Sequence, residues 1–233
     1  MSKHGEIMMS EIRQTPEIFS KIIANDQITP QLAALITDSS IKSILILARG
    51  TSDNAAHFMK YLVETQLGLP CGLTSPSSVS IYNSKLHYEN TLVVAISQSG
   101  KSTDLVQFAK SSKESGAKLV SITNDSRSPL AQVADFHISL QAGPEIAVAA
   151  TKSYSAQLLL SYLLVMKWAN KAPQIDKLVS EAEAALGQEA VIKEVAKGID
   201  LKGDLVVLGR GFAYPNRSEE HTSELHSHSF ISY

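Results

Sequence analysis

The sequence predicts an α/β protein with a doubly wound, flavodoxin-like parallel sheet of five strands flanked by helices. Two observations lead to this prediction. Short aliphatic runs alternate along the chain with longer segments of helical spacing, which is typical of parallel sheets. The runs SILILA (43–48) and TLVVAIS (91–97) also lack the polar alternation of a half-exposed strand. Both faces of these strands are therefore expected to be buried under helices.

The individual elements follow from the same patterns. Strands are expected at 43–48, 70–74, 91–97, 118–123 and 136–140, of which 70–74 has the weakest pattern. Helices are expected at 53–66, 103–115 and 151–170, with ends marked by Gly68, Gly116 and Lys171-Ala172-Pro173. Two amphipathic segments make residues 1–40 a helical lead-in to a domain at 41–172.

An internal repeat predicts a second domain. The stretch ILILARGTSDN (44–54) has an echo in LVVLGRGFAYP (205–215), with an Arg-Gly pair at corresponding positions. Residues 203–216 are interpreted as the first strand of that domain, after a helical connector at 173–202 with helices at 174–186 and 188–198.

No strand or core pattern follows the repeat. Residues 217–233, RSEEHTSELHSHSFISY, resemble a translated sequencing adapter, and we predict a non-native, disordered tail. His226 and His228 in this tail are accordingly not interpreted as a metal site.

Composition and charge exclude several classes of protein. The formal net charge of −2 gives no electrostatic reason to expect nucleic acid as a partner. The N-terminus lacks the apolar core of a signal peptide, and the most apolar run is shorter than the ~20 residues that span a membrane. The single cysteine, Cys71, builds neither a disulfide framework nor a zinc site. It is interpreted as a small core residue in a reducing cytoplasm.

Hydroxyl side chains gather where two of the strands are expected to end. Gly50, Thr51 and Ser52 follow the first strand, and Ser97, Gln98, Ser99, Gly100 and Ser102 follow the central one within VVAISQSGKSTD (93–104). Ligands of doubly wound sheets bind at these carboxyl ends, where helix N-termini attract anions. The pattern favours a phosphate site, and the alternative for each hydroxyl is a helix cap.

The kind of ligand is narrowed by two absent motifs. Neither GxxxxGK[ST] nor GxGxxG occurs in the chain, so the glycine is part of neither a P-loop nor a dinucleotide loop. We therefore expect a small phosphorylated ligand rather than a nucleotide.

Three blocks of sequence resemble the sugar isomerase (SIS) domain family. SQSGKSTD (97–104) is similar to the family signature SQSGxSxD, and ARGTSDNAA (48–56) and PEIAVAATKSYSAQL (144–158) are similar to two further blocks in the same order. The chain resembles the isomerase half of glucosamine-6-phosphate synthase and, more closely, SIS-type glucosamine-6-phosphate deaminases and phosphosugar isomerases. These relatives carry two SIS domains, so the resemblance implies a truncated second domain here.

The resemblance also implies roles for individual residues. Ser97, Gln98, Ser99 and Ser102 would hold the phosphate and nearby sugar hydroxyls, and Thr51 and Ser52 would complete the pocket. Val148 would contact the sugar through its backbone. Glu145 would support this loop or reach the sugar, and a carboxylate that caps the following helix is an equal alternative. Lys152 is interpreted as a solvated or cap-neutralising residue rather than a phosphate ligand.

The implied activity is isomerisation or deamination of an amino-sugar phosphate such as glucosamine 6-phosphate, with no metal and no redox cofactor. In the family, the carboxylate that moves the proton and the histidine that opens the ring lie in the second domain. The catalytic residues are therefore unknown here and the chain is expected to be inactive. His57 and His137 are interpreted as packed or surface residues.

Two further expectations concern partners. A homodimer is expected, because family members pair across their long helices and the apolar face at 158–168 exceeds what one small domain covers. The alternative function is a sugar-phosphate-sensing module of a transcription regulator. Residues 1–40 are too short and too acidic for a convincing DNA-binding helix-turn-helix, which disfavours this alternative.

Overall fold

The computed structural model describes residues 3–37, 40–199 and 207–219. Its five strands form one parallel sheet in the order β2-β1-β3-β4-β5, which confirms the predicted fold class. The strands are β1 (Ser43–Leu47), β2 (Cys71–Leu73), β3 (Thr91–Ile96), β4 (Lys118–Thr123) and β5 (Phe136–Ser139). The strand order reverses between β1 and β3, and this is where doubly wound sheets bind their ligands.

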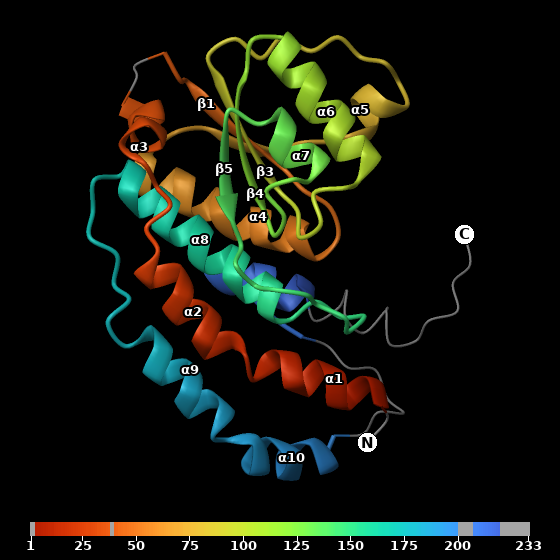
Figure 1. The fold of residues 1–233 in the computed structure, drawn as a ribbon, viewed down its shortest axis with the longest axis vertical. Helices are drawn as coiled ribbons and strands as arrows, with labels where there is room; N and C mark the ends of the chain where they lie inside the picture. Colours follow the sequence, from red (N-terminus) through yellow and green to blue (C-terminus); the bar gives the residue numbers. More distant parts are fainter. Residues whose placement is uncertain (1–2, 38–39, 200–206, 220–233) are drawn as a thin grey trace.

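Helices cover both faces of the sheet (Figure 1). One face carries α5 (Ser77–Ser80), α6 (Thr103–Glu114) and α7 (Pro129–Val133). The other carries α3 (Pro30–Thr37), α4 (Thr51–Leu62), which continues as the π-helix η1 (Val63–Leu67), and α8 (Lys152–Trp168). Outside α8 lie α1 (Lys3–Ile12), α2 (Thr15–Ala24), α9 (Leu178–Leu186) and α10 (Glu189–Lys197).

The core explains why the strand sequences show no polar alternation. Every residue of β3 is buried. Leu92, Val94 and Ile96 pack into the cluster under α4 and α8, while Val93 and Ala95 pack into the cluster under α6. Successive side chains of a strand point to opposite faces, so a strand covered on both sides needs apolar residues at every position.

The helix ends follow the sequence closely. Gly68 and Gly116 have φ values of +65° and +96°, the left-handed conformation that commonly ends a helix. Cys71 is buried, and burial raises the pKa of its thiol to about 12, as suits a core residue.

The long helix α8 is covered by its own chain. Leu159, Leu160, Leu164 and Val165 are buried with residues of α2, α3 and α4, and Trp168 Nε1 donates a hydrogen bond to the Leu32 carbonyl at 3.1 Å. The homodimer stays a prediction. The apolar face of α8 no longer supports it, because α2, α3 and α4 already cover much of that face.

The C-terminal segment differs in part from its prediction. Residues 203–206 of the expected strand lie outside the described residues, and 207–216 contain no strand but the 3₁₀ helix η2 (Gly211–Ala213). Its Phe212 ring lies 5.7 Å from the ring of Phe58, and Tyr214 lies 5.3 Å from His57. This contact agrees with the interpretation of His57 as a packed residue.

The prediction of an unpacked tail is wrong for residues 217–219. Glu219 is 7% exposed and accepts hydrogen bonds from Thr51 Oγ1 at 2.8 Å and Asn54 Nδ2 at 2.7 Å. The two donors lie in the first turn of α4, where the helix dipole also favours a carboxylate. The remainder of the tail, including His226 and His228, lies outside the described residues.

The described residues form neither a membrane-spanning helix nor a cluster of metal ligands. None of the helices in 3–37, 40–199 and 207–219 is both long and apolar enough to cross a membrane. Within those same ranges, histidine, cysteine and carboxylate side chains do not cluster as metal ligands.

Candidate functional site

A pocket of about 200 Å³ opens at the carboxyl ends of β1 and β3. The loops after these strands meet there because β1 and β3 pair in register, with Leu47 opposite Ala95. The lining residues come from the loops that lead into α4, α6 and α8 and from the first turns of α4 and α8: Arg49, Thr51, Ser52, Ser97, Gln98, Ser99, Ser102, Ala150, Ser153 and Gln157. The structure thus brings together all six of the hydroxyl and amide residues that the two loops were predicted to supply.

The SQSG loop is held in shape by its own serines. The Gly100 N–H donates to Ser97 Oγ at 3.1 Å, and the Lys101 N–H donates to Ser99 Oγ at 3.3 Å. These bonds use oxygen lone pairs, so each hydroxyl keeps its O–H to donate to a ligand. Gly100 does not line the pocket but forms the turn, with φ +62°.

The helix-cap alternative is not realised at Ser102. This residue is the N-cap of α6 and makes no side-chain cap bond, while the N-cap of α4 is Gly50, which has no side chain to cap with. Gly50 has φ +58° and, like Gly100, shapes a turn rather than lining the pocket. The N-cap residues therefore leave the first backbone N–H groups of both helices available to an anion.

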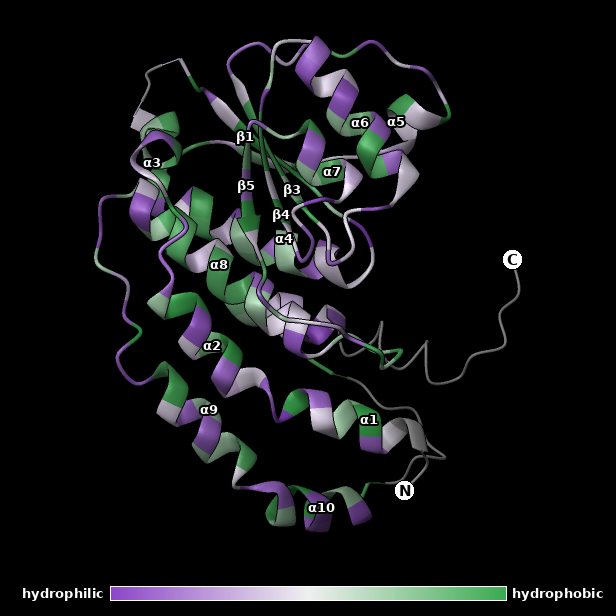
Figure 2. Ribbon diagram, viewed as in Figure 1, coloured by the Kyte–Doolittle hydropathy of each residue, from purple (hydrophilic) through white to green (hydrophobic). Residues whose placement is uncertain are grey.

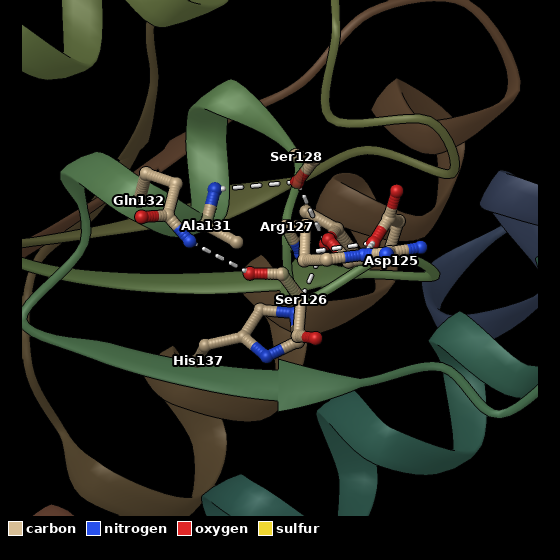
Figure 3. Close-up of polar contacts among 8 residues, drawn as sticks. Asp125, Ser126, Arg127, Ser128, Ala131, Gln132 and His137 are labelled. Atoms are coloured by element: carbon tan, nitrogen blue, oxygen red, sulfur yellow. Dashed lines mark hydrogen bonds and ion pairs between the residues drawn. The ribbon is translucent and has the colours of Figure 1, made fainter.

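A buried polar cluster stands behind the SQSG loop. Thr123 Oγ1 lies 2.9 Å from His137 Nε2 and 3.3 Å from Ser128 Oγ, which accepts a bond from the Ala131 N–H (Figure 3). A Cβ on Gly100 would lie 2.4 Å from Ser128 Oγ. The cluster therefore fixes how close the loop approaches β4.

His137 belongs to this cluster and does not line the pocket. Its half-burial lowers the pKa of the imidazole, which the Thr123 contact and the Asp125 carboxylate partly offset. This agrees with its interpretation as a packed histidine.

The loop between β5 and α8 forms the third wall. Glu145 accepts bonds from the N–H groups of Thr151 at 2.9 Å and Ser153 at 3.2 Å, and from the Ser153 hydroxyl. Glu145 thus caps α8 and also supports the end of the loop through the Thr151 N–H, and it is not among the lining residues. The Val148 side chain is 70% exposed and is not among the lining residues.

Lys152 differs from its interpretation as a solvated residue. It is 2% exposed, and its Nζ donates to Gln14 Oε1 at 2.8 Å. The side chain leaves the start of α8 on the side of α1, away from the pocket lining, and it lines a separate cavity there.

Four lining residues were missed: Arg49, Ala150, Ser153 and Gln157. Gln157 is 1% exposed and its Nε2 donates to Ser52 Oγ at 3.1 Å. Ser153 and Gln157 are four residues apart, so they share one face of α8, and this spacing was a usable signal. Arg49 is ion-paired with Asp104 at 2.6 Å, a contact that links the starts of α4 and α6.

The chemistry of the lining is that of a binding site. It offers the hydroxyls of Ser97, Ser99 and Ser102, the Gln98 amide, the Arg49 guanidinium and two helix N-termini, while the hydroxyls of Thr51 and Ser153 already donate to carboxylates. Among the described residues, the lining contains neither a carboxylate nor an imidazole, so its chemistry suits binding of an anion and of hydroxyl groups rather than general-base catalysis.

Comparison with known proteins agrees with this geometry. The SIS domain family matches residues 39–167. Two glutamine–fructose-6-phosphate aminotransferases (isomerizing) are similar to this chain. That of Methanosarcina mazei is 34% identical, over 77% of this chain and 31% of its own length. That of Methanothermobacter thermautotrophicus is 33% identical, over 93% of this chain and 36% of its own length. The chain thus spans about a third of the length of these curated relatives.

Solved structures extend the likeness. The C-terminal domain of the glucosamine–fructose-6-phosphate aminotransferase from Francisella tularensis has a TM-score of 0.77 and 27% identity, over 94% of this chain and 66% of that one. The glucosamine-6-phosphate deaminase of Thermotoga maritima shares the fold. Its TM-score is 0.75 at 21% identity, and the match covers 96% of this chain and 66% of the deaminase chain. With the family match covering more than half of its residues, the chain belongs to the SIS domain family.

Proposed function

We propose that this chain binds a phosphosugar and represents the substrate-binding part of an aldose–ketose isomerase or deaminase acting on an amino-sugar phosphate. The observation that carries the proposal is the group of hydroxyl and amide side chains at the start of two helices, with no carboxylate among the described residues of the lining. Such a pocket stabilises a dianion by charge-assisted hydrogen bonds. The names of the relatives, which include fructose-6-phosphate and glucosamine-6-phosphate enzymes, point to the same class of ligand.

The two ends of the pocket suggest how the ligand lies. Ser97, Ser99 and Ser102 stand at the start of α6 and form the phosphate end. Ser52 in α4, Ala150 in the β5–α8 loop and Ser153 in the first turn of α8 line the other side and would face the sugar. We therefore name glucosamine 6-phosphate and fructose 6-phosphate as the ligands to test. A homodimer and a cytoplasmic location belong to the same proposal; the single cysteine, Cys71, has no second cysteine in the sequence to pair with, which suits a reducing compartment.

Calorimetric titration tests the proposal. We expect both sugar phosphates to bind, and glucosamine and fructose without the phosphate to bind hardly at all. Replacing Ser97 and Ser99 together by Ala removes two charge-assisted bonds of about 1.5–3 kcal/mol each, so affinity should fall by about a hundredfold or more.

The matched control is Ser75→Ala with Ser126→Ala, two exposed serines away from the pocket. It should bind like the parent. Because Ser97 also accepts a bond within the loop, the thermal unfolding of each variant is measured alongside. Equal affinity of the pocket variant and the parent would show that the serines serve only the turn.

A further inference from the structure

The β5–α8 loop, residues 140–151, is held from outside by the N-terminal helix. Glu11, at the end of α1, is 4% exposed. Its Oε1 accepts a hydrogen bond from the Ile146 N–H, and its Oε2 accepts one from the Ala147 N–H at 3.1 Å. One carboxylate therefore holds two successive backbone amides of the loop that ends at the pocket.

Packing alone does not explain why the loop keeps this path. The space between α1 and the loop is an open cavity of about 590 Å³, so polar contacts rather than close-packed side chains join the two. The loop also presents Ile146 and Val148 to solvent, with 73% and 70% of each residue exposed. A loop with two exposed apolar side chains gains by rearranging to bury them, unless its backbone is fixed.

The attachment is repeated at the end of the loop. Lys152, the first residue of α8, donates from Nζ to Gln14 Oε1 at 2.8 Å, so the N-terminal helices contact this region both in the middle of the loop and directly after its end. Within the loop, Glu145 accepts hydrogen bonds from the N–H groups of Thr151 and Ser153, which fixes the junction between the loop and α8. Between these anchors lies Ala150, which lines the pocket.

We propose that Glu11 is a positioning residue for the sugar end of the pocket: it sets the path of the β5–α8 loop and so the placement of the wall that Ala150 and Ser153 form. Glu11 lies ahead of the residues that the SIS family matches, 39–167, so the helix that carries it acts on the pocket from outside the domain. The choice of ligand in this proposal rests on the proposed phosphosugar function. The role of Glu11 in fixing the loop does not depend on that function.

The first test needs no ligand. Glu11→Gln keeps the size of the side chain but removes the charge and turns one acceptor into a donor that faces an N–H group. In the 233-residue chain, we expect amide hydrogen exchange at Ile146 and Ala147 to speed up by at least about tenfold, since charge-assisted bonds are the stronger class. Glu6→Gln, an exposed glutamate on the same helix and cavity, is the control and should leave both amides unchanged.

The second test separates the sugar end from the phosphate end. Glu11→Gln should weaken fructose 6-phosphate binding by up to about tenfold, because losing charge-assisted bonds to the loop loosens the wall that faces the sugar, and it should leave inorganic phosphate binding unchanged. Amide exchange in β3 reports whether each variant is folded. Unchanged exchange at Ile146 and Ala147 would overturn the proposal, and so would faster exchange with unchanged fructose 6-phosphate binding. If the parent binds no sugar phosphate at all, the proposed function fails while the exchange result still stands.

Discussion

At the scale of single residues, Gly100 is the position where the fold and the candidate site constrain each other most. Its φ of +62° lies in the left-handed region, and an added Cβ would lie 2.4 Å from Ser128 Oγ and 2.7 Å from Ser128 Cβ. Gly143 has a similar φ of +65° with nothing within 4 Å of an added Cβ. The two glycines therefore separate the cost of the backbone conformation from the cost of the contact.

We expect Gly143→Ala to lower the free energy of unfolding by about 1–2 kcal/mol, the cost of a left-handed alanine. Gly100→Ala should lower it by a further 1–3 kcal/mol or so, because an overpacked site must shift its neighbours. It should also weaken sugar-phosphate binding, because the SQSG loop moves. Urea unfolding and calorimetry measure both quantities, and equal stability of the two variants would contradict the contact argument.

His137 should make stability depend on pH. Burial lowers the pKa of its imidazole in the folded protein, so below the ordinary value of about 6.5 the unfolded chain takes up a proton that the folded chain resists. The unfolded state then binds more protons, and stability falls as pH decreases from about 6.5 toward the folded-state pKa. The charged group facing the ring is the Asp125 carboxylate, which moderates the effect.

The check is the difference between two unfolding series over pH 5 to 8, that of the parent and that of His137→Gln. The parent should lose more stability on acidification than the variant. Parallel curves would show that this histidine titrates alike in both states.

At the scale of elements, α10 exposes apolar side chains to solvent. Figure 2 shows hydrophobic and hydrophilic residues side by side on it, and Val191, Ile192 and Val195 are each at least 60% exposed. An apolar face of this kind attracts other apolar surfaces. We expect the chain to self-associate through it at high concentration.

Val195→Lys should reduce that association, measured by sedimentation, and change the free energy of unfolding by no more than about 0.5 kcal/mol, as for most surface substitutions. Glu194→Lys, a charge change at the neighbouring position, is the control for charge alone. If both variants reduce association equally, net charge rather than the apolar face controls it.

The same scale shows how far the sequence could predict this molecule. Strands such as 91–97 were recognisable because burial on both faces demands an unbroken apolar run. The helices α5 and α7 are too short for periodicity to show, so they were missed. In the site, Ser97 and Ser99 were predictable because they follow a strand directly. Glu11 was not, because its role depends on where a loop more than a hundred residues later is placed.

At the scale of the whole molecule, binding and turnover should separate. Aldose–ketose isomerisation needs a base within hydrogen-bond reach of the substrate carbon, about 2.6–3.2 Å. The lining offers hydroxyls, amides and the Arg49 guanidinium, and none of these is a base at neutral pH. The Glu219 carboxylate lies on Thr51 and Asn54 at the start of α4, with both oxygens already accepting hydrogen bonds.

We therefore expect the chain to bind fructose 6-phosphate without exchanging its C1 protons. Incubation in deuterium oxide, followed by proton NMR of the sugar, measures this directly, with the Ser97→Ala, Ser99→Ala variant as the non-binding control. Deuterium at C1 that depends on the two serines would contradict the prediction and place a base at the pocket. Glu219→Gln would then decide whether that base is Glu219, since this substitution removes the carboxylate beside Thr51 and leaves the serine end of the pocket unchanged.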